Sequence, residues 1–462
     1  MVGENCPKIF NLFSEILDKI CRRVYNNNNL EWRKIMTNYF EQTVKSISES
    51  IRFDSSPSKS TSALPFGKGC ADCLAHFLTL AQSLGFQTKN YGNYVGEVVF
   101  GEGEPFAILA HLDVVPAGSG WTKAPFGGEV SDGKIWGRGA IDDKGPAMCV
   151  LYAMKALKDE GFVPSRQIKF IVGCNEESGW ACIEHYNEVA EIPAEGFSPD
   201  GSFPVIYAEK GILHVRLHFP MGEKPPFFFL EGGTSANMVC DECSATPRTL
   251  TLTRAREMGL EIRNKKLTAH GTAAHGSTPE LGKNAILPIL RFFEEKSPQV
   301  KNIIECLFED KFRLTELEDE TGKLTLSPNM IKYRKGEVQV ICDIRYPATV
   351  PYAEVVRRLG QIGVKYETIH HQPPLMQDKE SPLVQTLLNA FTACTGKDAS
   401  PIAIGGGTYA RALKNGVAFG PEMEDDEPVM HRADEYITLE RVQLLLDVYK
   451  RAIRDLTRDL TR

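Results

Sequence analysis

Five segments of this chain place histidine or acidic side chains where they could hold a metal ion. Each segment follows an apolar run or forms a glycine-flanked turn, and the segments lie far apart in the sequence. Their candidate residues are His111 with Asp113, Asp142 with Asp143, Glu176 with Glu177, Asp200, and His431. Two histidines with several carboxylates and no thiol are donors typical of a catalytic divalent centre, not of a closed structural zinc site. Because a carboxylate beside a ligand can accept a proton, the pattern predicts a metal centre with its own general base.

Each of these residues also has an ordinary interpretation when it is taken alone. A pair such as Glu176-Glu177 suits the start of a solvated helix, where carboxylates favour the positive end of the helix dipole. An aspartate between glycines, such as Asp142, is common turn chemistry. The metal centre is favoured because all five segments carry suitable donors together.

Alternating strands and helices are expected to position these side chains. Apolar runs rich in β-branched residues predict strands at Val95–Phe100, Phe106–His111 and Gln167–Cys174, and the spacing in Gly145–Leu157 predicts a helix. This alternation indicates an α/β fold with a mostly parallel sheet flanked by helices. Open sheets of this kind bind ligands at the carboxyl ends of their strands. His111 stands at one such end.

The middle of the chain has a different pattern of apolar and polar residues. Residues 212–219 and 338–345 largely alternate between apolar and polar residues, which predicts antiparallel strands, and helices are expected at 284–293 and 352–362. After His371 the α/β texture returns, with helices at 381–394 and 438–455 and a strand at 401–404. We therefore predict an inserted α+β lid domain. The expected organisation is a helical extension at 1–29, a catalytic domain at 30–211 and 375–462, and the lid at 212–374.

Composition narrows the classes of partner. The 462 residues carry a net charge of −7 with interleaved signs, which argues against nucleic acid, because phosphate binding needs clustered Lys and Arg. The apolar runs are too short to span a membrane, and residues 1–13 lack a secretory signal pattern. We expect a cytoplasmic protein whose twelve cysteines are reduced. The pairs Cys70/Cys73 and Cys240/Cys243 leave a zinc knuckle open, but this spacing in an apolar run is more typical of packing.

The ordered motifs resemble the co-catalytic di-zinc exopeptidase family of carboxypeptidase G, the aminoacylases and the PepV-type dipeptidases. The resemblance runs from about Trp32 to the C-terminus. It rests on His111-Leu-Asp113-Val-Val-Pro-Ala-Gly118, Gly137-Arg-Gly-Ala-Ile-Asp-Asp-Lys-Gly-Pro146, Gly405-Gly-Gly-Thr-Tyr-Ala-Arg411 and Met430-His431. It implies two divalent ions per chain, with zinc expected first and manganese or cobalt left open.

The resemblance also implies a role for each residue of the centre. His111 and Asp200 would bind one ion, Glu177 and His431 the other, and Asp142 both. Asp113 would orient a ligand and fix the tautomer of His111. Glu176 would take a proton from a metal-bridging water and pass it to the leaving amine. The peptide bond between Asp142 and Asp143 is expected to be cis.

Four further positions are implied to bind substrate, together with a histidine of the lid. His275 would stabilise the oxyanion, and Asn237 would contact the same oxygen. Arg345 would clamp the substrate carboxylate, although an arginine beside Asp343 is also an ordinary strand pair. Gly406 and Thr408 would contact substrate. The long lid implies that His275 serves its own chain and that the protein is a monomer.

These features predict an enzyme that hydrolyses dipeptides. Deacylation of N-acyl amino acids is the alternative, because it uses the same metals and differs in what the amine-side pocket accepts. A non-catalytic peptide- or metal-binding protein is a third interpretation. The presence of Glu176 beside all five ligands argues against it.

Overall fold

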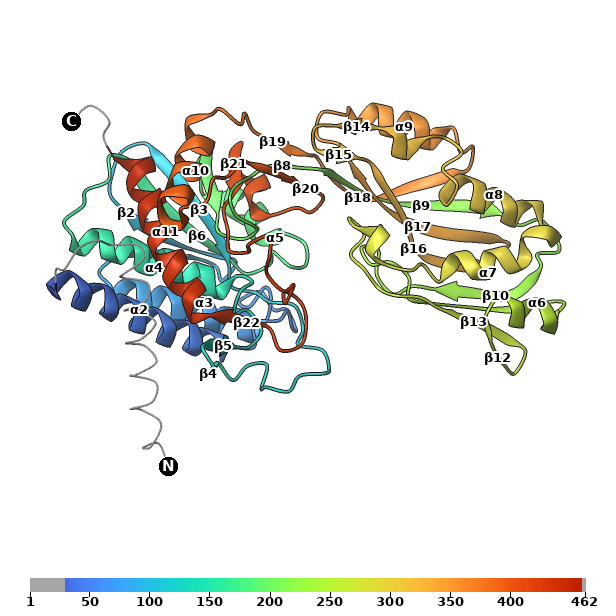
Figure 1. Ribbon diagram of the computed structural model, residues 1–462, viewed down its shortest axis with the longest axis horizontal. Coiled ribbons are helices and arrows are strands. Elements are labelled where there is room, and N and C mark those ends of the chain that lie inside the picture. The colour runs from blue at the N-terminus through green and yellow to red at the C-terminus, as the bar shows by residue number, and fades with distance from the viewer. Residues whose placement is uncertain (1–29, 459–462) are drawn as a thin grey trace. The chain divides into compact units, whose positions relative to one another are not determined.

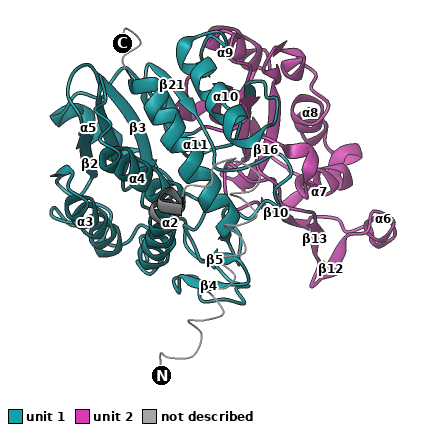
Figure 2. Ribbon diagram, turned by 60° about the vertical axis from the view of Figure 1, so that its left-hand side comes forward, with its two compact units in different colours: residues 1–207, 377–402, 408–462 teal, residues 208–376, 403–407 magenta. Residues whose placement is uncertain are grey.

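The computed structural model describes residues 30–458, with side chains from residue 38 onward (Figure 1). The predicted helical extension at 1–29 lies outside the described residues. The chain forms two compact units (Figure 2). Unit 1 contains the residues up to 207, 377–402 and those from 408 onward, and unit 2 contains Ala208–Met376 and Ala403–Gly407. Unit 2 thus takes in a short segment, 403–407, that lies outside the predicted lid.

Unit 1 is built on a sheet that is parallel in its centre and antiparallel at both edges. β6, β3, β7 and β21 run parallel, and β1 and β2 on one side and β8 and β19 on the other are antiparallel. In spatial order the strands are β1 (Gln87–Tyr91), β2 (Val95–Phe100), β6 (Gln167–Gly173), β3 (Pro105–His111), β7 (Glu195–Ser198), β21 (Asn415–Ala418), β8 (Ile206–Glu209) and β19 (Leu375–Met376), with β20 (Ile402–Ile404) beside β8. The chain passes between the units within β8, after β19, within β20 and after Gly407, so β19 and parts of β8 and β20 in this sheet belong to unit 2. The predicted fold class is confirmed.

The helices of unit 1 begin where their sequences provide caps. Ser381 and Thr438 each accept a hydrogen bond from a backbone amide three residues later, and Pro382 occupies the first helical position. The helices are α2 (Leu30–Ile51), α3 (Lys68–Ser83), α4 (Lys144–Asp159), α5 (Ala181–Val189), α10 (Pro382–Thr395) and α11 (Leu439–Thr457), with a 3-10 turn η4 (Tyr409–Ala412). α4 packs against α2 and α11 and is buried over most of its length, because few of its residues are polar.

A small antiparallel sheet in unit 1 joins two segments of the expected centre. It consists of β4 (Glu129–Ser131), β5 (Lys134–Trp136) and β22 (Tyr436–Thr438). Trp136 lies opposite Tyr436 in the ladder between β5 and β22. β5 precedes the turn that carries Asp142, and β22 follows the loop that carries His431. The pairing of β5 with β22 therefore brings this turn and this loop together.

Unit 2 contains an eight-stranded antiparallel sheet and four α-helices. In spatial order the strands are β12 (Glu261–Arg263), β13 (Lys266–His270), β11 (Glu242–Pro247), β10 (Phe227–Gly232), β16 (Thr325–Arg334), β17 (Glu337–Tyr346), β9 (Gly211–Pro220) and β18 (Lys365–Gln372). The helices are α6 (Leu252–Glu257), α7 (Ile286–Phe293), α8 (Pro298–Leu307) and α9 (Tyr352–Gly360); the shorter elements are η1 (Pro279–Leu281), η2 (Glu294–Lys296), η3 (Leu314–Glu316), β14 (Glu318–Asp319) and β15 (Gly322–Lys323). The two predicted antiparallel strands are β9 and β17, which pair directly.

The described cysteines are all free thiols, and nearly all are buried. Cys70 and Cys73 lie in α3 with their side chains in the core, as the apolar spacing predicts. Burial raises the pKa of the Cys70 thiol to about 12, so this group is neutral and serves packing. Within residues 30–458, the helices are too short or too polar to cross a membrane.

Candidate metal centre

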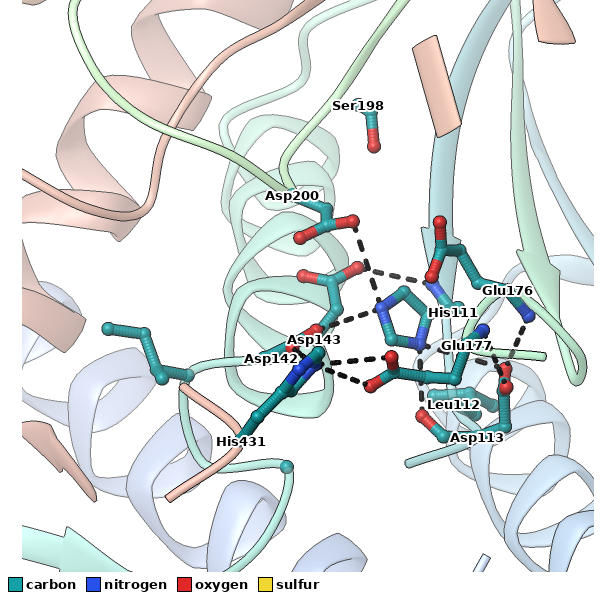
Figure 3. Close-up of polar contacts among 12 residues, drawn as sticks. His111, Leu112, Asp113, Asp142, Asp143, Glu176, Glu177, Ser198, Asp200 and His431 are labelled. Carbon is teal, nitrogen blue, oxygen red and sulfur yellow. Dashed lines mark hydrogen bonds and ion pairs between the residues drawn. The ribbon is translucent and has the colours of Figure 1, made fainter. Parts of the chain in front are cut away.

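Five donor side chains converge at the carboxyl ends of the parallel strands of unit 1 (Figure 3). His111 ends β3, Asp200 follows β7, and Glu177 follows β6. Asp142 lies in the turn before α4, and His431 lies in the loop before β22. Donor atoms of His111, Asp142 and Glu177 all lie within 4.8 Å of one another, as do those of His111, Glu176 and Asp200. We call His111, Asp142, Glu177, Asp200 and His431 the candidate metal centre.

The tautomer of His111 can be assigned from its contacts. Its buried ring places Nδ1 2.9 Å from the carbonyl oxygen of Asp113, which can only accept, so Nδ1 carries the hydrogen. Nε2 then directs its lone pair at Asp142, whose Oδ1 lies 3.0 Å away. Two acceptors at this distance repel each other unless a proton or a metal cation lies between them. Burial alone would lower the pKa of His111, but its hydrogen bonds to Asp113 and Asp142 raise it well above its ordinary value.

His431 faces the other oxygen of Asp142. Its Nε2 lies 2.8 Å from Asp142 Oδ2 and 3.2 Å from both carboxylate oxygens of Glu177. Burial opposes the charged form of the ring, but the two carboxylates raise the pKa of His431 to about 11. Asp142 therefore lies between the two histidines, one on each oxygen, as a residue that contacts two ions would.

Negative charge exceeds positive charge in this part of unit 1. Burial, followed by the charge of Asp142, raises the pKa of Asp200 to about 7, and burial also raises the pKa values of Asp143, Glu176 and Glu177. Oδ1 of Asp143 is buried and, among the described residues, has no hydrogen-bond partner. Buried carboxylates that are not paired with basic side chains need cations. The residues present therefore fit divalent cations, and their nitrogen and oxygen donors suit zinc, manganese or cobalt.

Asp113 organises the centre through its backbone as well as its side chain. Its carboxylate accepts hydrogen bonds from the backbone amides of Glu176 at 3.0 Å and Glu177 at 3.1 Å. The nearer carboxylate oxygen lies 3.6 Å from His111 Nδ1, farther than the carbonyl oxygen of the same residue. The family resemblance implies that Asp113 orients a ligand and fixes the tautomer of His111. The carbonyl oxygen of Asp113 is the acceptor nearest to His111 Nδ1, and its carboxylate holds the Glu176-Glu177 turn.

The turn before α4 is anchored on several sides. The peptide bond between Asp142 and Asp143 is cis, which confirms that prediction. Asp143 Oδ2 accepts a hydrogen bond from the backbone amide of His111 at 3.1 Å. The buried Lys144 donates to the carbonyl oxygens of Ser50 at 3.2 Å and Phe53 at 2.8 Å. These contacts fix the turn against the end of β3 and the segment that ends α2.

Trp180 contacts Glu176 and was not predicted as a site residue. Its indole nitrogen donates to Glu176 Oε1 at 3.3 Å, and its ring meets Tyr409 edge-on with centroids 5.3 Å apart. An indole N–H needs an acceptor when its ring packs against the protein. The position of Trp180 four residues after Glu176 was therefore the feature of the sequence that could have predicted this contact.

Two of the predicted substrate residues lie side by side in unit 2. The backbone amide of Gly276 donates to the carbonyl oxygen of Asn237 at 2.7 Å. His275 Nδ1 accepts from the amide of Ser277 at 3.2 Å, so in the neutral ring Nε2 carries the hydrogen. His275 and Asn237 are both exposed side chains. A histidine with a hydrogen on Nε2 can donate to an oxyanion.

Arg345 is held by its strand neighbour. Its Nε and Nη2 donate to the two oxygens of Asp343 at 2.7 and 2.9 Å, and Nη1 donates to the carbonyl oxygen of Gly405 at 3.0 Å. The ordinary strand pair is therefore present, and it occupies the Nε edge of the guanidinium. A substrate carboxylate would have to use the Nη1–Nη2 edge. Gly276 is required beside this pair, because a Cβ there would lie 2.3 Å from Asp343 Oδ2.

The last two predicted positions fall on either side of a unit boundary. Gly406 belongs to unit 2, and Thr408 belongs to unit 1. The hydroxyl of Thr408 accepts from the backbone amide of Ala410 at 3.2 Å and so caps η4. This structural role is separate from the predicted contact with substrate.

Comparison with known proteins places this site in a family context. The sequence profile of peptidase family M20/M25/M40 matches residues 107–455, which contain all five donors. YtjP of Bacillus subtilis (strain 168) is 34% identical over 93% of this chain and 100% of its own length. Beta-Ala-Xaa dipeptidase of Lactobacillus delbrueckii subsp. lactis is 33% identical over 93% of this chain and 99% of its own. The similarity therefore extends over both units.

The fold also matches a solved structure. Human carnosine dipeptidase 1 superimposes with a TM-score of 0.59, covering 96% of this chain and 99% of its own, at 14% sequence identity. At this identity the likeness concerns the fold alone.

Proposed function

Because this chain belongs to peptidase family M20/M25/M40, we propose that it hydrolyses the peptide bond of dipeptides with two divalent metal ions held by the candidate metal centre. The observation that carries the proposal is the convergence of the five donors beside the carboxylate of Glu176, which the family resemblance assigns as the base and not as a ligand. The choice of dipeptides is supported by the Lactobacillus dipeptidase, which is similar over almost its whole length.

Glu176 is the proposed general base. Burial, together with the charges of Asp200 and Glu177, raises the pKa of Glu176, which favours its taking up a proton. When bound, the two ions would lower the pKa of a water molecule and polarise the substrate carbonyl. The hydrogen bonds of Glu176 to Trp180 and Asp113 fix its carboxylate and its backbone. Glu176 would then pass the proton to the leaving amine.

Residues of unit 2 are proposed to recognise the substrate. His275 would donate from Nε2 to the oxyanion, because its Nδ1 is already an acceptor from Ser277. Asn237 would contact the same oxygen, as the family resemblance implies. Arg345, oriented by Asp343, would read the free carboxylate of the dipeptide.

A substrate panel tests this function against the alternative of N-acyl amino acid deacylation. We expect the metal-loaded protein to hydrolyse dipeptides with a free amine and to turn over the matching N-acetyl amino acids at least about 100-fold more slowly in kcat/KM, a difference of roughly 2.7 kcal/mol. Faster turnover of the N-acetyl compounds would favour the deacylase. Bound metal without turnover of either class would favour a binding protein.

Arg345→Ala is expected to erase a preference for dipeptides over dipeptide amides. A charge-assisted hydrogen bond contributes about 1.5–3 kcal/mol, so kcat/KM for the acid should fall about 10- to 100-fold while that for the amide changes little. Arg216→Ala is the matched control, because Arg216 lies on the neighbouring strand β9 and pairs with Glu367. Equal kcat/KM for acid and amide in the unmodified protein would show that Arg345 does not read the carboxylate.

A further inference from the structure

A buried ion pair in unit 1 connects the segment that carries Asp142 with the segment that carries His431. Arg138 and Glu435 are 1% and 0% exposed, and Arg138 Nη1 lies 2.6 Å from Glu435 Oε2. The other oxygen of Glu435 accepts from the backbone amides of Gly139 at 2.9 Å and Ile141 at 3.2 Å. One carboxylate therefore holds the turn that ends in Asp142.

The same pair also holds the loop that carries His431. Arg138 Nη1 donates to the carbonyl oxygen of Arg432 at 3.2 Å, next to His431 in the chain. The amide of Gly137 donates to the carbonyl oxygen of Glu435 at 2.9 Å. Residues about 294 positions apart in the sequence are thus joined by side-chain and backbone hydrogen bonds. The side chains of the pair therefore add to the backbone pairing of β5 with β22 that already joins these segments.

The two histidines of the centre depend on their surroundings to different degrees. His111 is fully buried and oriented by the Asp113 carbonyl oxygen. The side chain of His431 is 53% exposed, its φ of 60° lies in the left-handed region, and its described contacts run through Nε2 to Asp142 and Glu177. Packing therefore fixes His111, whereas the position of His431 depends on how its backbone is held.

A second anchor acts on the same loop. Asp434 Oδ1 accepts from the backbone amides of Thr122 at 2.8 Å and Lys123 at 3.1 Å, and Oδ2 accepts from the Thr122 hydroxyl at 2.9 Å. This anchor ties the loop to residues 122–123, and it makes no bond to the Asp142 turn. In the described part of the chain, the side-chain bonds of the Arg138–Glu435 pair link the loop of His431 to the turn of Asp142, in addition to the backbone pairing of β5 with β22 and the Gly137–Glu435 backbone bond.

Stability alone does not explain such a pair. Two well-packed apolar side chains often replace a buried ion pair at no cost in folding free energy, because the pair must be stripped of water. What the pair provides here is a fixed distance between two loops. Groups that hold ligands commonly change metal affinity 10- to 100-fold when they are altered.

We infer that Arg138 and Glu435 are positioning residues that set the spacing between Asp142 and His431 and thereby the affinity for the ion that these two share. The inference rests on the proposed two-metal centre. It predicts an asymmetric effect: loss of the pair weakens the ion on the His431 side and spares the ion on the His111 side.

The test is a zinc titration of the full chain against a coloured chelator, which reports both affinities without any substrate. The informative variant is the double change Arg138→Met with Glu435→Gln. The oxygen of the glutamine at position 435 can still accept from the backbone amides of Gly139 and Ile141. Its amide group then faces the apolar methionine at position 138. The methionine cannot donate to the carbonyl oxygen of Arg432, so that bond is lost. Asp426→Asn is the matched control, because it breaks the bidentate pair with Arg441 on the same segment, at 2.7 and 2.9 Å.

We expect the double variant to bind one zinc ion as the unmodified protein does and the second at least about tenfold more weakly, with Asp426→Asn unchanged. Thermal unfolding of the metal-free double variant confirms that it folds, so a lost ion cannot be ascribed to a lost fold. Two unchanged affinities, or two equally weakened ones, would overturn the inference. Fewer than two ions in the unmodified protein would instead overturn the two-metal proposal, before any variant is compared.

Discussion

Glu176→Gln is expected to lower kcat by about 10²- to 10⁴-fold while the protein keeps both metal ions. The carboxylate of Glu176 accepts a hydrogen bond from Trp180, and the ion pairs of Asp142 with His111 and His431 do not involve it, so loss of its charge leaves those contacts in place. Glutamine can still accept from the indole of Trp180 through its oxygen. What it cannot do is take up and release a proton at neutral pH.

Glu177→Gln should give the opposite result. Glu177 lies 3.2 Å from His431 Nε2, so its neutralisation should weaken one ion, and activity should be recovered in part by raising the metal concentration. Elemental analysis beside steady-state kinetics separates the two variants, with Glu184→Gln in α5 as an acidic control near the same loop. If Glu176→Gln loses metal and Glu177→Gln keeps it, the roles within the pair are exchanged.

Removal of metal by a chelator is expected to abolish activity, and zinc, manganese or cobalt should restore it. The buried carboxylates of the centre need cations to balance their charge, and the proposed reaction needs the bound ions. Because the ligands bind metal only when they are deprotonated, added metal displaces their protons and restores the centre. Full activity in a protein that elemental analysis shows to be metal-free would contradict the proposed mechanism.

The metal-free protein should also respond to pH in a defined direction. Asp200 has its pKa raised to about 7 in the folded state, and an acid with a raised folded pKa stabilises the fold when protonated. That contribution is fully present below the ordinary pKa of 3.8 and is lost as pH rises from there to about 7. The raised pKa of His431 acts in the same direction, since above its ordinary pKa of 6.5 the folded protein keeps a proton that the unfolded chain releases. The melting temperature of the metal-free protein should therefore fall from about pH 4 to pH 8, and metal should remove most of this dependence.

The sequence predicts the donors of the centre better than the contacts that hold them. His111 ends a buried apolar run and Asp200 lies in a turn before a glycine, and both patterns can be read locally from the sequence. Contacts between distant segments leave no such pattern. Neither the periodicity of residues 137–143 nor that of 430–435 shows that Arg138 and Glu435 meet.

Unit 2 was harder to predict for a related reason. Phe227, Phe228 and Phe229 follow one another in β10, which hides the alternation of a strand. Phe228 is 60% exposed, and the guanidinium carbon of Arg248 lies 4.3 Å from the centroid of its ring. The cation above the ring, and not burial, therefore accounts for an aromatic residue at this position.

The helix α8 was not predicted, although Ser297 caps it and Pro298 occupies its first position.

The division of the chain into units sets an order of assembly during synthesis. Unit 2 is nearly continuous, so residues 208–376 can pack as soon as they leave the ribosome. Unit 1 cannot close its sheet until β21 inserts between β7 and β8, and α4 lacks one of its two packing helices until α11 has been made. The N-terminal half of the catalytic unit thus waits for the part of the chain made last. His431 comes within that part, so a nascent chain has His111, Asp142, Glu177 and Asp200 long before it has the fifth donor. The candidate metal centre therefore cannot be complete until the part of unit 1 synthesised last is present.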